Sequence, residues 1–397
     1  MDLGFPTIDC DQHYYEPRDA FTRHMAKKHL PLAVHTALDA DGVEQTYVGD
    51  KVYGFTRPFF DAAVKPGGLR DLLQSMKSGK VTDGHEIMRY HPPEIIEPAE
   101  RVKLLEAQHV DAAFMLPSLG VCVEHLMDDN VEATYANLDS FNRWIEEEWG
   151  FGFAGRTIGV PLISLLDVGE ACRQIDDLID RGSRVFHLRS GPVGRPHGKS
   201  PAHPDFDPFW SRVNEAGLVC AMHVAENGYN EYFSTLWGEE PNPNSHYQSA
   251  WQWTCSYGDK PIMDTVASMI FMNLFSRFPN LKMLTIELGS LWVPYILAQM
   301  NKMGGMGRNG PWPGGKIDER PAEIFKRHFW VSPYHEEKME PLIDLIGADH
   351  VVFGSDFPHA EGLADPNDFA TPLRSLGADV VRQVMRGNAA GLLGVPG

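Results

Sequence analysis

From residue 98 onward, short apolar segments alternate with helix-like segments, and this alternation constrains the fold more than any other feature of the sequence. Segments such as 111–118 and 218–224 are almost continuously apolar, which is typical of strands buried on both faces of a parallel sheet. Amphipathic segments at 98–108, 131–149 and 168–180 predict helices between the strands. The predicted strands are a first one that ends at 11–13, and then 111–118, 156–163, 184–189, 218–224, 281–287, 328–332 and 350–356.

Roughly eight parallel strands separated by helices predict a (β/α)8 barrel, with its active site at the carboxyl ends of the strands. A doubly wound sheet is the alternative, but no glycine-rich phosphate loop follows the first strand. We expect one domain over residues 1–397, with an insertion at about 40–95 that is rich in glycine, proline and charge. The insertion contains a predicted hairpin around Gly49-Asp50, and it is either a lid over the active site or a surface loop without a catalytic role.

Composition limits the partners of the chain. Lys and Arg total 35 against 54 Asp and Glu, a net charge of −19, so binding to nucleic acid or to an anionic membrane is not expected. The five cysteines are scattered without a C-x-x-C pair, which predicts neither a disulfide framework nor a thiolate zinc site. With no signal peptide and no membrane-length apolar run, we expect a soluble cytoplasmic protein that acts on a small molecule.

Polar side chains stand at the carboxyl ends of the predicted strands, where most chains have ordinary loops. Asp11 and His13 are two residues apart, so in an extended strand they project from the same face. On a closed barrel, imidazoles and carboxylates from several strands would meet at one point, where they need a cation between them. A satisfied core histidine is the alternative for His187, between Phe186 and Leu188. The candidate metal ligands are Asp11, His13, His187, His223, Glu287 and Asp356, and further candidate site residues are His335 and His359.

Several motifs, in this order, make the sequence resemble the amidohydrolase superfamily. They are Asp-Gln-His at 11–13, Pro-x-Phe-Asp-Pro-Phe-Trp at 204–210, Met-His at 222–223, Phe-Pro-Asn-Leu-Lys at 278–282, Phe-Gly-Ser-Asp-Phe-Pro-His at 353–359 and Arg-Gly-Asn-Ala at 386–389. Within the superfamily, the chain is similar to the amidohydrolase-related branch that includes aminocarboxymuconate semialdehyde decarboxylase and resorcylate decarboxylases. The resemblance covers nearly the whole chain.

The resemblance implies that Asp11, His13, His223 and Asp356 bind a divalent metal. One position departs from the family pattern: where the decarboxylases have a proton-transferring His, this sequence has Glu287. That departure puts simple decarboxylation in doubt and adds a carboxylate that can ligate a second metal. Together with His187, it makes a binuclear site our expectation. A mixture of imidazole and carboxylate without thiolate suits iron, manganese or zinc, and the large share of carboxylates favours iron.

The sequence is also similar to a subgroup of non-haem di-iron acyl-CoA thioesterases. We therefore expect a metal-dependent hydrolase that cleaves a thioester by attack of a metal-bound hydroxide. Asp356 and Glu287 are the expected catalytic carboxylates, and the resemblance implies that Asp356 takes the proton from the attacking water. His359 or His335 would orient the substrate. The alternatives are a non-oxidative decarboxylase of an aromatic or enoic acid, with Glu287 in proton transfer, an amide or lactone hydrolase, and an inactive barrel that serves as a scaffold.

Two further expectations concern partners. The helical stretch 262–305 is rich in Met and Phe, so it either packs a second subunit in a homodimer or packs within the chain. The insertion carries four cations that would meet the phosphates of coenzyme A, or that are simply solvated: Arg57, Arg70, Lys77 and Lys80.

Overall fold

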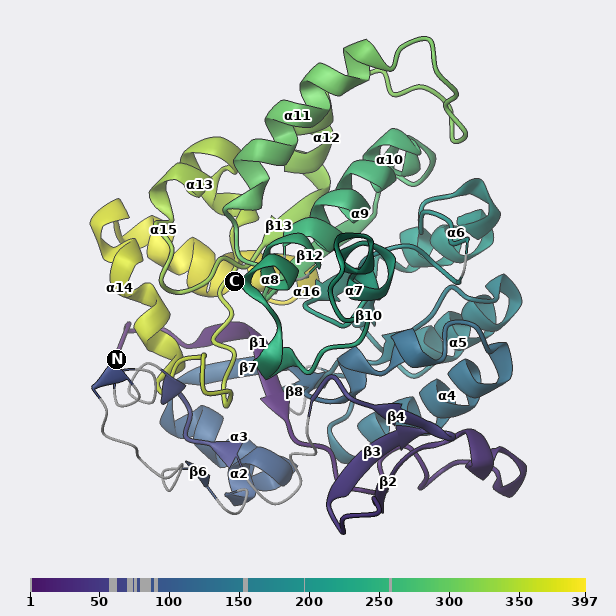
Figure 1. Cartoon of the computed structure of the whole chain (residues 1–397). Coiled ribbons are helices and arrows are strands. Elements are labelled where there is room, and N and C mark those ends of the chain that lie inside the picture. Colours follow the sequence, from purple (N-terminus) through teal and green to yellow (C-terminus); the bar gives the residue numbers. More distant parts are fainter. Residues whose placement is uncertain are drawn as a thin grey trace.

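The computed structural model describes residues 2–56, 63–69, 74, 77–78, 87–88, 92–152, 156–195, 197–256 and 259–397. Within these residues, parallel strands form a barrel that is surrounded by helices (Figure 1). The barrel strands are β1 (Thr7–Tyr14), β7 (Val110–Pro117), β8 (Thr157–Gly159), β9 (Leu162–Ile163), β10 (Val185–Leu188), β11 (Val219–His223), β12 (Lys282–Ile286) and β13 (Phe329–Val331). The chain therefore has the predicted (β/α)8 architecture.

Hydrogen bonds close the barrel at two places where the strand is interrupted or irregular. The predicted strand 156–163 is split into β8 and β9 because its partners change. The amide of Val160 donates to Met115 on one side, and Pro161 accepts from the amide of His187 on the other. The last strand, predicted over 350–356, forms only isolated bridges. Its residues nevertheless join β13 to β1, since the amide of Val352 donates to the carbonyl of Val331 at 3.0 Å, and Phe353 accepts from the amide of Cys10 at 2.9 Å.

The helices follow the strands in the expected alternation. Two of them begin at side-chain caps: Asn130 accepts from the amide of Ala133, and Asp167 accepts from the amide of Glu170. The helices are α2 (Pro93–Ile96), α3 (Pro98–Ala107), α4 (Val131–Glu148), α5 (Val168–Asp180), α6 (Asp207–Ala216), α7 (Tyr229–Tyr232), α8 (Ala250–Ser256), α9 (Asp259–Phe271), α10 (Leu274–Arg277), α11 (Trp292–Met306), α12 (Pro321–His328), α13 (Glu340–Ile346), α14 (Ala370–Leu373), α15 (Ala378–Arg382) and α16 (Asn388–Leu393). None of the helices in the described part of the chain is long and apolar enough to cross a membrane.

Every second residue of the strands belongs to one buried apolar cluster. The same alternation decides to which side the polar residues at the strand ends project. On β11, Val219 and Ala221 belong to the cluster, and on β12 Leu284 and Ile286 do, together with side chains of α16. Because residues two apart in a strand share a face, His223 projects to the same side as Val219 and Ala221. The opposite faces pack against the surrounding helices in a second and larger cluster. The barrel is therefore apolar inside until its strands reach their carboxyl ends.

The excursion after β1 contains a small antiparallel sheet at the periphery of the barrel (Figure 1). Its strands are β2 (Val34–Leu38), β3 (Glu44–Val48) and β4 (Lys51–Tyr53), and β5 (Ala63–Val64) pairs with β6 (Ile87–Met88). The predicted hairpin around Gly49 is present as β3 and β4, and β2 precedes the predicted start of the insertion near residue 40. Part of this excursion touches the eighth strand's loop, since Leu69 donates its amide to the carbonyl of Ala360 at 2.9 Å. Arg57, Arg70 and Lys80 lie outside the described residues.

Candidate metal centre

The carboxyl end of β1 supplies the first two side chains of a polar cluster inside the barrel. His13 is fully buried, and its Nδ1 lies 3.2 Å from the carbonyl oxygen of Pro117, which can only accept a hydrogen bond. Nδ1 therefore carries the proton, and the lone pair of Nε2 faces the cluster, 3.2 Å from Asp11 Oδ1. Burial lowers the pKa of His13 well below its usual value, and the neighbouring His359 and His223 add to this, so the ring stays neutral. A neutral imidazole with a free lone pair is the form that binds metals.

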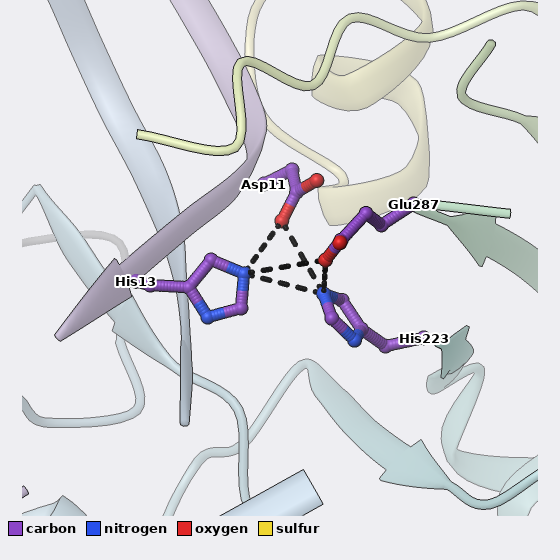
Figure 2. A group of neighbouring side chains, drawn as sticks. All are labelled: Asp11, His13, His223 and Glu287. Carbon is purple, nitrogen blue, oxygen red and sulfur yellow. Dashed lines mark hydrogen bonds and ion pairs between the residues drawn. The ribbon is translucent and has the colours of Figure 1, made fainter. Parts of the chain in front are cut away.

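His223 at the end of β11 has the same orientation. Its Nδ1 lies 2.7 Å from the carbonyl oxygen of Val224, and its Nε2 lies 3.2 Å from Nε2 of His13. Glu287, directly after β12, brings Oε2 to 2.8 Å from the same His223 Nε2 (Figure 2). Figure 2 shows the side chains of His13, His223, Glu287 and Asp11 pointing toward one another from three strands. Two imidazoles that are both oriented by carbonyl groups thus direct their other nitrogens at one point.

Two carboxylate oxygens of this cluster lack hydrogen-bond donors among the described residues. Asp11 Oδ1 and Glu287 Oε2 are buried, and neither accepts a hydrogen bond with proper geometry from any residue that the structure describes. Burial raises the pKa of Asp11 and of Asp356 well above the usual range, because two or more carboxylates share a site with little water. Within the described residues, two four-residue groups have ligand atoms within 4.8 Å of one another: Asp11, His13, His223 and Glu287, and His13, Glu287, Asp356 and His359. A divalent cation fits both the charge and the orientation of these groups.

Asp356 and His359 extend the cluster at the eighth strand. His359 Nδ1 lies 2.7 Å from Asp356 Oδ1, and its ring stacks on that of His13 with centroids 4.1 Å apart. Nε2 of His359 is 3.0 Å from the hydroxyl of Ser118, whose own proton is donated to the carbonyl of Tyr14. The hydroxyl of Ser118 must therefore accept from Nε2–H, and a proton is also needed between Nδ1 and Asp356. The two side chains thus share a proton at the edge of the candidate metal site.

Two of these acidic residues adopt backbone conformations that non-glycine residues rarely use. Glu287 has a φ of 52° and Asp356 a φ of 55°, both left-handed. Such a conformation costs on the order of 1–3 kcal/mol per residue, so the surrounding structure must enforce it. At Asp356 the backbone is tied to the first strand, since the amide of Asp356 donates to the carbonyl of Asp11 at 2.9 Å. Strain of this kind is typical of residues that are held in place for function.

Two buried groups that support β1 were missed in the sequence. Asp9 accepts hydrogen bonds from the amide of Asp11 and from both the amide and the hydroxyl of Ser355, which ties the first strand to the eighth. Burial raises the pKa of Asp9 to about 6. Arg101 on α3 donates to the carbonyl of His13 at 2.8 Å and to Gln12 Oε1 at 3.1 Å. Asp9 could have been predicted as a supporting residue, because it lies two residues before Asp11 on the same strand. Arg101 could not, because a lone Arg within an amphipathic helix has no distinguishing pattern.

Two predicted site residues lie apart from the two groups. His187 is buried on β10 and its Nε2 has no hydrogen-bond partner among the described residues, but it belongs to neither group. Burial, with His223 and Arg189, lowers the pKa of His187 to about 3. His335 pairs with Glu336 at 3.5 Å and lines a cavity of about 790 Å³. Besides His335, the residues described around this cavity are Gly67, Leu69, Gln74, Lys77, Glu336, Ala360, Glu361, Gly362, Leu363 and Ala364.

Comparison with known proteins identifies the family. The amidohydrolase family model matches residues 8–395, and the chain therefore belongs to this family. The structure is similar to that of an amidohydrolase from Mycobacterium avium subsp. paratuberculosis K-10, with 32% identity, a TM-score of 0.87, and coverage of 99% of this chain and 100% of the other. No curated protein sequence matches the chain.

More distant structures share the fold. A 2,6-dihydroxybenzoate decarboxylase from Rhizobium is 15% identical with a TM-score of 0.62, covering 98% of this chain and 99% of its own. A dihydroxybenzoic acid decarboxylase from Polaromonas sp. JS666, with bound manganese and the inhibitor 2-nitroresorcinol, is 14% identical with a TM-score of 0.63, covering 98% and 97%. The family and the cluster at the strand ends together make this chain a metal-dependent enzyme of the amidohydrolase family.

Proposed function

We propose that the protein is a non-oxidative decarboxylase of an aromatic or enoic acid that uses one divalent metal ion. Asp11, His13, His223 and Asp356 would hold the ion, and Glu287 would transfer the proton. The observation that carries the proposal is the approach of two buried imidazole nitrogens to 3.2 Å, with both rings oriented by carbonyl groups and with unpaired carboxylate oxygens around them.

The compactness of the cluster favours one ion over two. Within each group, the ligand atoms all lie within 4.8 Å of one another, a spacing that one ion can span. His187, which the binuclear expectation needed as a further ligand, belongs to neither group. With one ion, Glu287 is not required as a bridge and is available for proton transfer.

The proposed reaction replaces a carboxylate by a proton at one carbon atom. When bound, the ion would supply a Lewis acid that holds and orients the substrate. Glu287 would deliver a proton to the carbon that carries the carboxylate. The bond from that carbon to the carboxylate then breaks, its electron pair remains on the substrate, and carbon dioxide leaves. Asp356 and His359 would pass a proton from water to Glu287, which restores it for the next turnover.

The structural neighbours support this choice over hydrolysis. Several proteins with the same fold are decarboxylases of hydroxylated benzoic acids, and one of them contains manganese. Their identity to this chain is 14–15%, so their substrates enter here as support for a proposal. Position 287 lacks the imidazole that transfers the proton in the decarboxylases. In this chain the carboxylate of Glu287 stands at the same strand end, 2.8 Å from His223, and would take over that role.

The test is carbon dioxide release from a panel of hydroxylated benzoic and enoic acids by the manganese-loaded enzyme. We expect release with at least one acid, loss of release on treatment with a chelator, and recovery on adding manganese. Glu287→Gln should keep the metal and lose release. Absence of release across the panel, with hydrolysis of acyl-CoA thioesters instead, would refute the proposal.

Thioester hydrolysis remains the second candidate, because one observation favours it. The two groups overlap at His13 and Glu287, which is the arrangement expected if a carboxylate bridges two metal ions. In that case Glu287 is a ligand, and iron, zinc or manganese would all suit the donor set. Lys77 lines the 790 Å³ cavity, where a coenzyme A phosphate would meet it. Loss of one of two bound metals in Glu287→Ala would favour this candidate.

The homodimer also remains a prediction. Leu291, Tyr295 and Met306, in and beside α11, are more than half exposed. A second copy of the chain that covers this face would explain their exposure. The concentration dependence of the molar mass in solution tests this expectation, and a monomer at all concentrations would contradict it.

A further inference from the structure

The turn that follows β12 is held by a loop that contributes nothing to the metal cluster itself. This turn, residues 287–290, contains two left-handed residues, Glu287 with a φ of 52° and Gly289 with a φ of 60°. The loop that packs on it is 332–339, between β13 and α13. Contacts from this loop are therefore needed to keep Glu287 in a conformation that its side chain disfavours.

Tyr334 and Glu337 of this loop bind the turn at three points. The hydroxyl of Tyr334 donates to the carbonyl oxygen of Glu287 itself, at 3.1 Å. Glu337 Oε2 accepts from the amide of Ser290 at 2.9 Å and also from its hydroxyl. The packing over Gly289 is direct, since a Cβ there would lie 2.7 Å from the ring of Tyr334 and 2.8 Å from Glu337 Oε1. The backbone of the turn, from the carbonyl of Glu287 to the amide of Ser290, is thus fixed from the loop.

Both contacts persist under ordinary conditions. The carbonyl oxygen of Glu287 can only accept a hydrogen bond, and the hydroxyl of Tyr334 supplies the donor. The carboxyl of Glu337 has oxygens facing both donors of Ser290, and a carboxyl oxygen accepts hydrogen bonds whether or not the group is ionised. Tyr334 is 39% exposed, so its hydroxyl can be removed without creating a cavity in the core.

We propose that Tyr334 and Glu337 are positioning residues that hold Glu287 in its left-handed conformation and so aim its carboxylate at the metal cluster. The inference rests on the proposed function, because it requires an ion beside Glu287. His335 and Glu336, which lie between the two positioning residues, line the 790 Å³ cavity. One short loop therefore forms a wall of that cavity and also sets the position of Glu287.

The experiment measures manganese affinity, which does not depend on knowing the substrate. The full-length protein is stripped with a chelator and titrated with manganese by calorimetry, as wild type, Tyr334→Phe, Glu287→Gln and the double variant. Tyr295→Phe is the matched control, because it removes a hydroxyl from an exposed tyrosine on α11, away from the cluster. Thermal unfolding of every metal-free variant reports separately on stability.

We expect Tyr334→Phe to bind manganese about tenfold more weakly than wild type, the effect of losing one ordinary hydrogen bond. In the Glu287→Gln background, Tyr334→Phe should have little effect on manganese affinity, because the carboxylate that Tyr334 positions is gone. Glu337→Ala should also weaken binding, and Glu337→Gln, whose amide oxygen still accepts from Ser290, should restore most of the affinity.

Three outcomes would overturn the inference. Equal manganese affinity in Tyr334→Phe and Tyr295→Phe would show that Tyr334 does not act on the cluster. If Tyr334→Phe weakens manganese binding equally with and without the charge of Glu287, Tyr334 acts by another route. A lower unfolding temperature of Tyr334→Phe with unchanged manganese affinity would show that Tyr334 only stabilises the fold. If the wild type itself binds no manganese, zinc or iron, the proposed function fails, and that result is distinct from the other three.

Discussion

The two sides of the metal centre are held in different ways. On the β1 side, Asp11 and His13 are fixed from within the core, by Asp9 and Arg101 and by the carbonyl of Pro117. On the β12 side, Glu287 sits in a strained turn and is fixed by Tyr334, a partly exposed residue of a loop.

This difference separates two tasks. On the β1 side, the residues that hold Asp11 and His13 are themselves buried and hydrogen-bonded. Asp11 and His13 would therefore bind the ion in fixed positions. The loop side would set the position of the one acidic group whose role decides between proton transfer and metal bridging. Substitutions on the β1 side should therefore remove the ion or the fold, and those on the loop side should adjust the site.

The largest effect is expected from His13→Ala. Loss of a supporting residue costs about 10–100-fold in metal affinity, and loss of a ligand should exceed that. We expect manganese affinity to fall by more than about 100-fold and activity to be lost with it. His187→Ala is the matched control, because His187 is an equally buried histidine outside both groups. Calorimetric titration of both variants checks this, and equal losses would mean that His187 is also a ligand.

Arg101→Ala should cause the next largest effect, on stability. It leaves the buried carbonyl of His13, the buried amide oxygen of Gln12 and the partly buried carbonyl of Glu94 without their donor. We expect the free energy of unfolding to fall by about 3 kcal/mol, since each buried group left unpaired costs about 1–3 kcal/mol. Arg173→Ala removes an arginine from exposed ion pairs and should cost less than about 1 kcal/mol. Urea denaturation measures both, and similar costs would contradict the comparison.

Glu16→Gln should change how stability depends on pH. Glu16 accepts from the amides of Leu119 and Gly120, and burial raises its pKa from 4.5 to about 7. Because the folded state favours the protonated form, this group stabilises the fold fully below pH 4.5, and the contribution is lost as the pH rises through about 7. The wild type should therefore lose about 3 kcal/mol relative to Glu16→Gln over that range, as 1.36 kcal/mol per pKa unit implies. Parallel pH profiles of the two proteins would refute this.

The smallest effect is expected from His335→Ala. The side chain is part of the cavity wall and lies outside both ligand groups, so manganese affinity should be unchanged. Stability should change by less than about 0.5 kcal/mol, as is usual for substitutions outside the core. A rise in KM without a change in kcat would place substrate in the cavity. Loss of manganese binding would instead mean that the loop holds the ion directly, against the division of tasks described above.

The fold and most of the cluster could be predicted because they follow from periodicity. Strands buried on both faces are continuously apolar, and the ends of parallel strands converge, so Asp11, His13, His223 and Asp356 could be brought together without a structure. The last strand was harder, because residues 351–353 join the barrel through isolated bridges and no regular ladder.

The supports of the site could not be predicted, since they depend on packing between distant segments. Arg101 reaches His13 from α3, and Tyr334 reaches Glu287 across two loops, with no local signal at either residue. His187 shows the opposite limit. Its place on a strand next to β11 suggested a ligand, and that role stays a prediction. His187 belongs to neither group, because membership depends on how far the side chain reaches, and strand order does not encode that reach.

The most direct test of the central claim is the metal content of wild type and Glu287→Ala, purified without added metal and loaded with an excess of manganese. The account predicts about one metal per chain in both, because Asp11, His13, His223 and Asp356 remain. Two metals in the wild type that fall to one in the variant would contradict it, and would establish Glu287 as a ligand of a binuclear hydrolase.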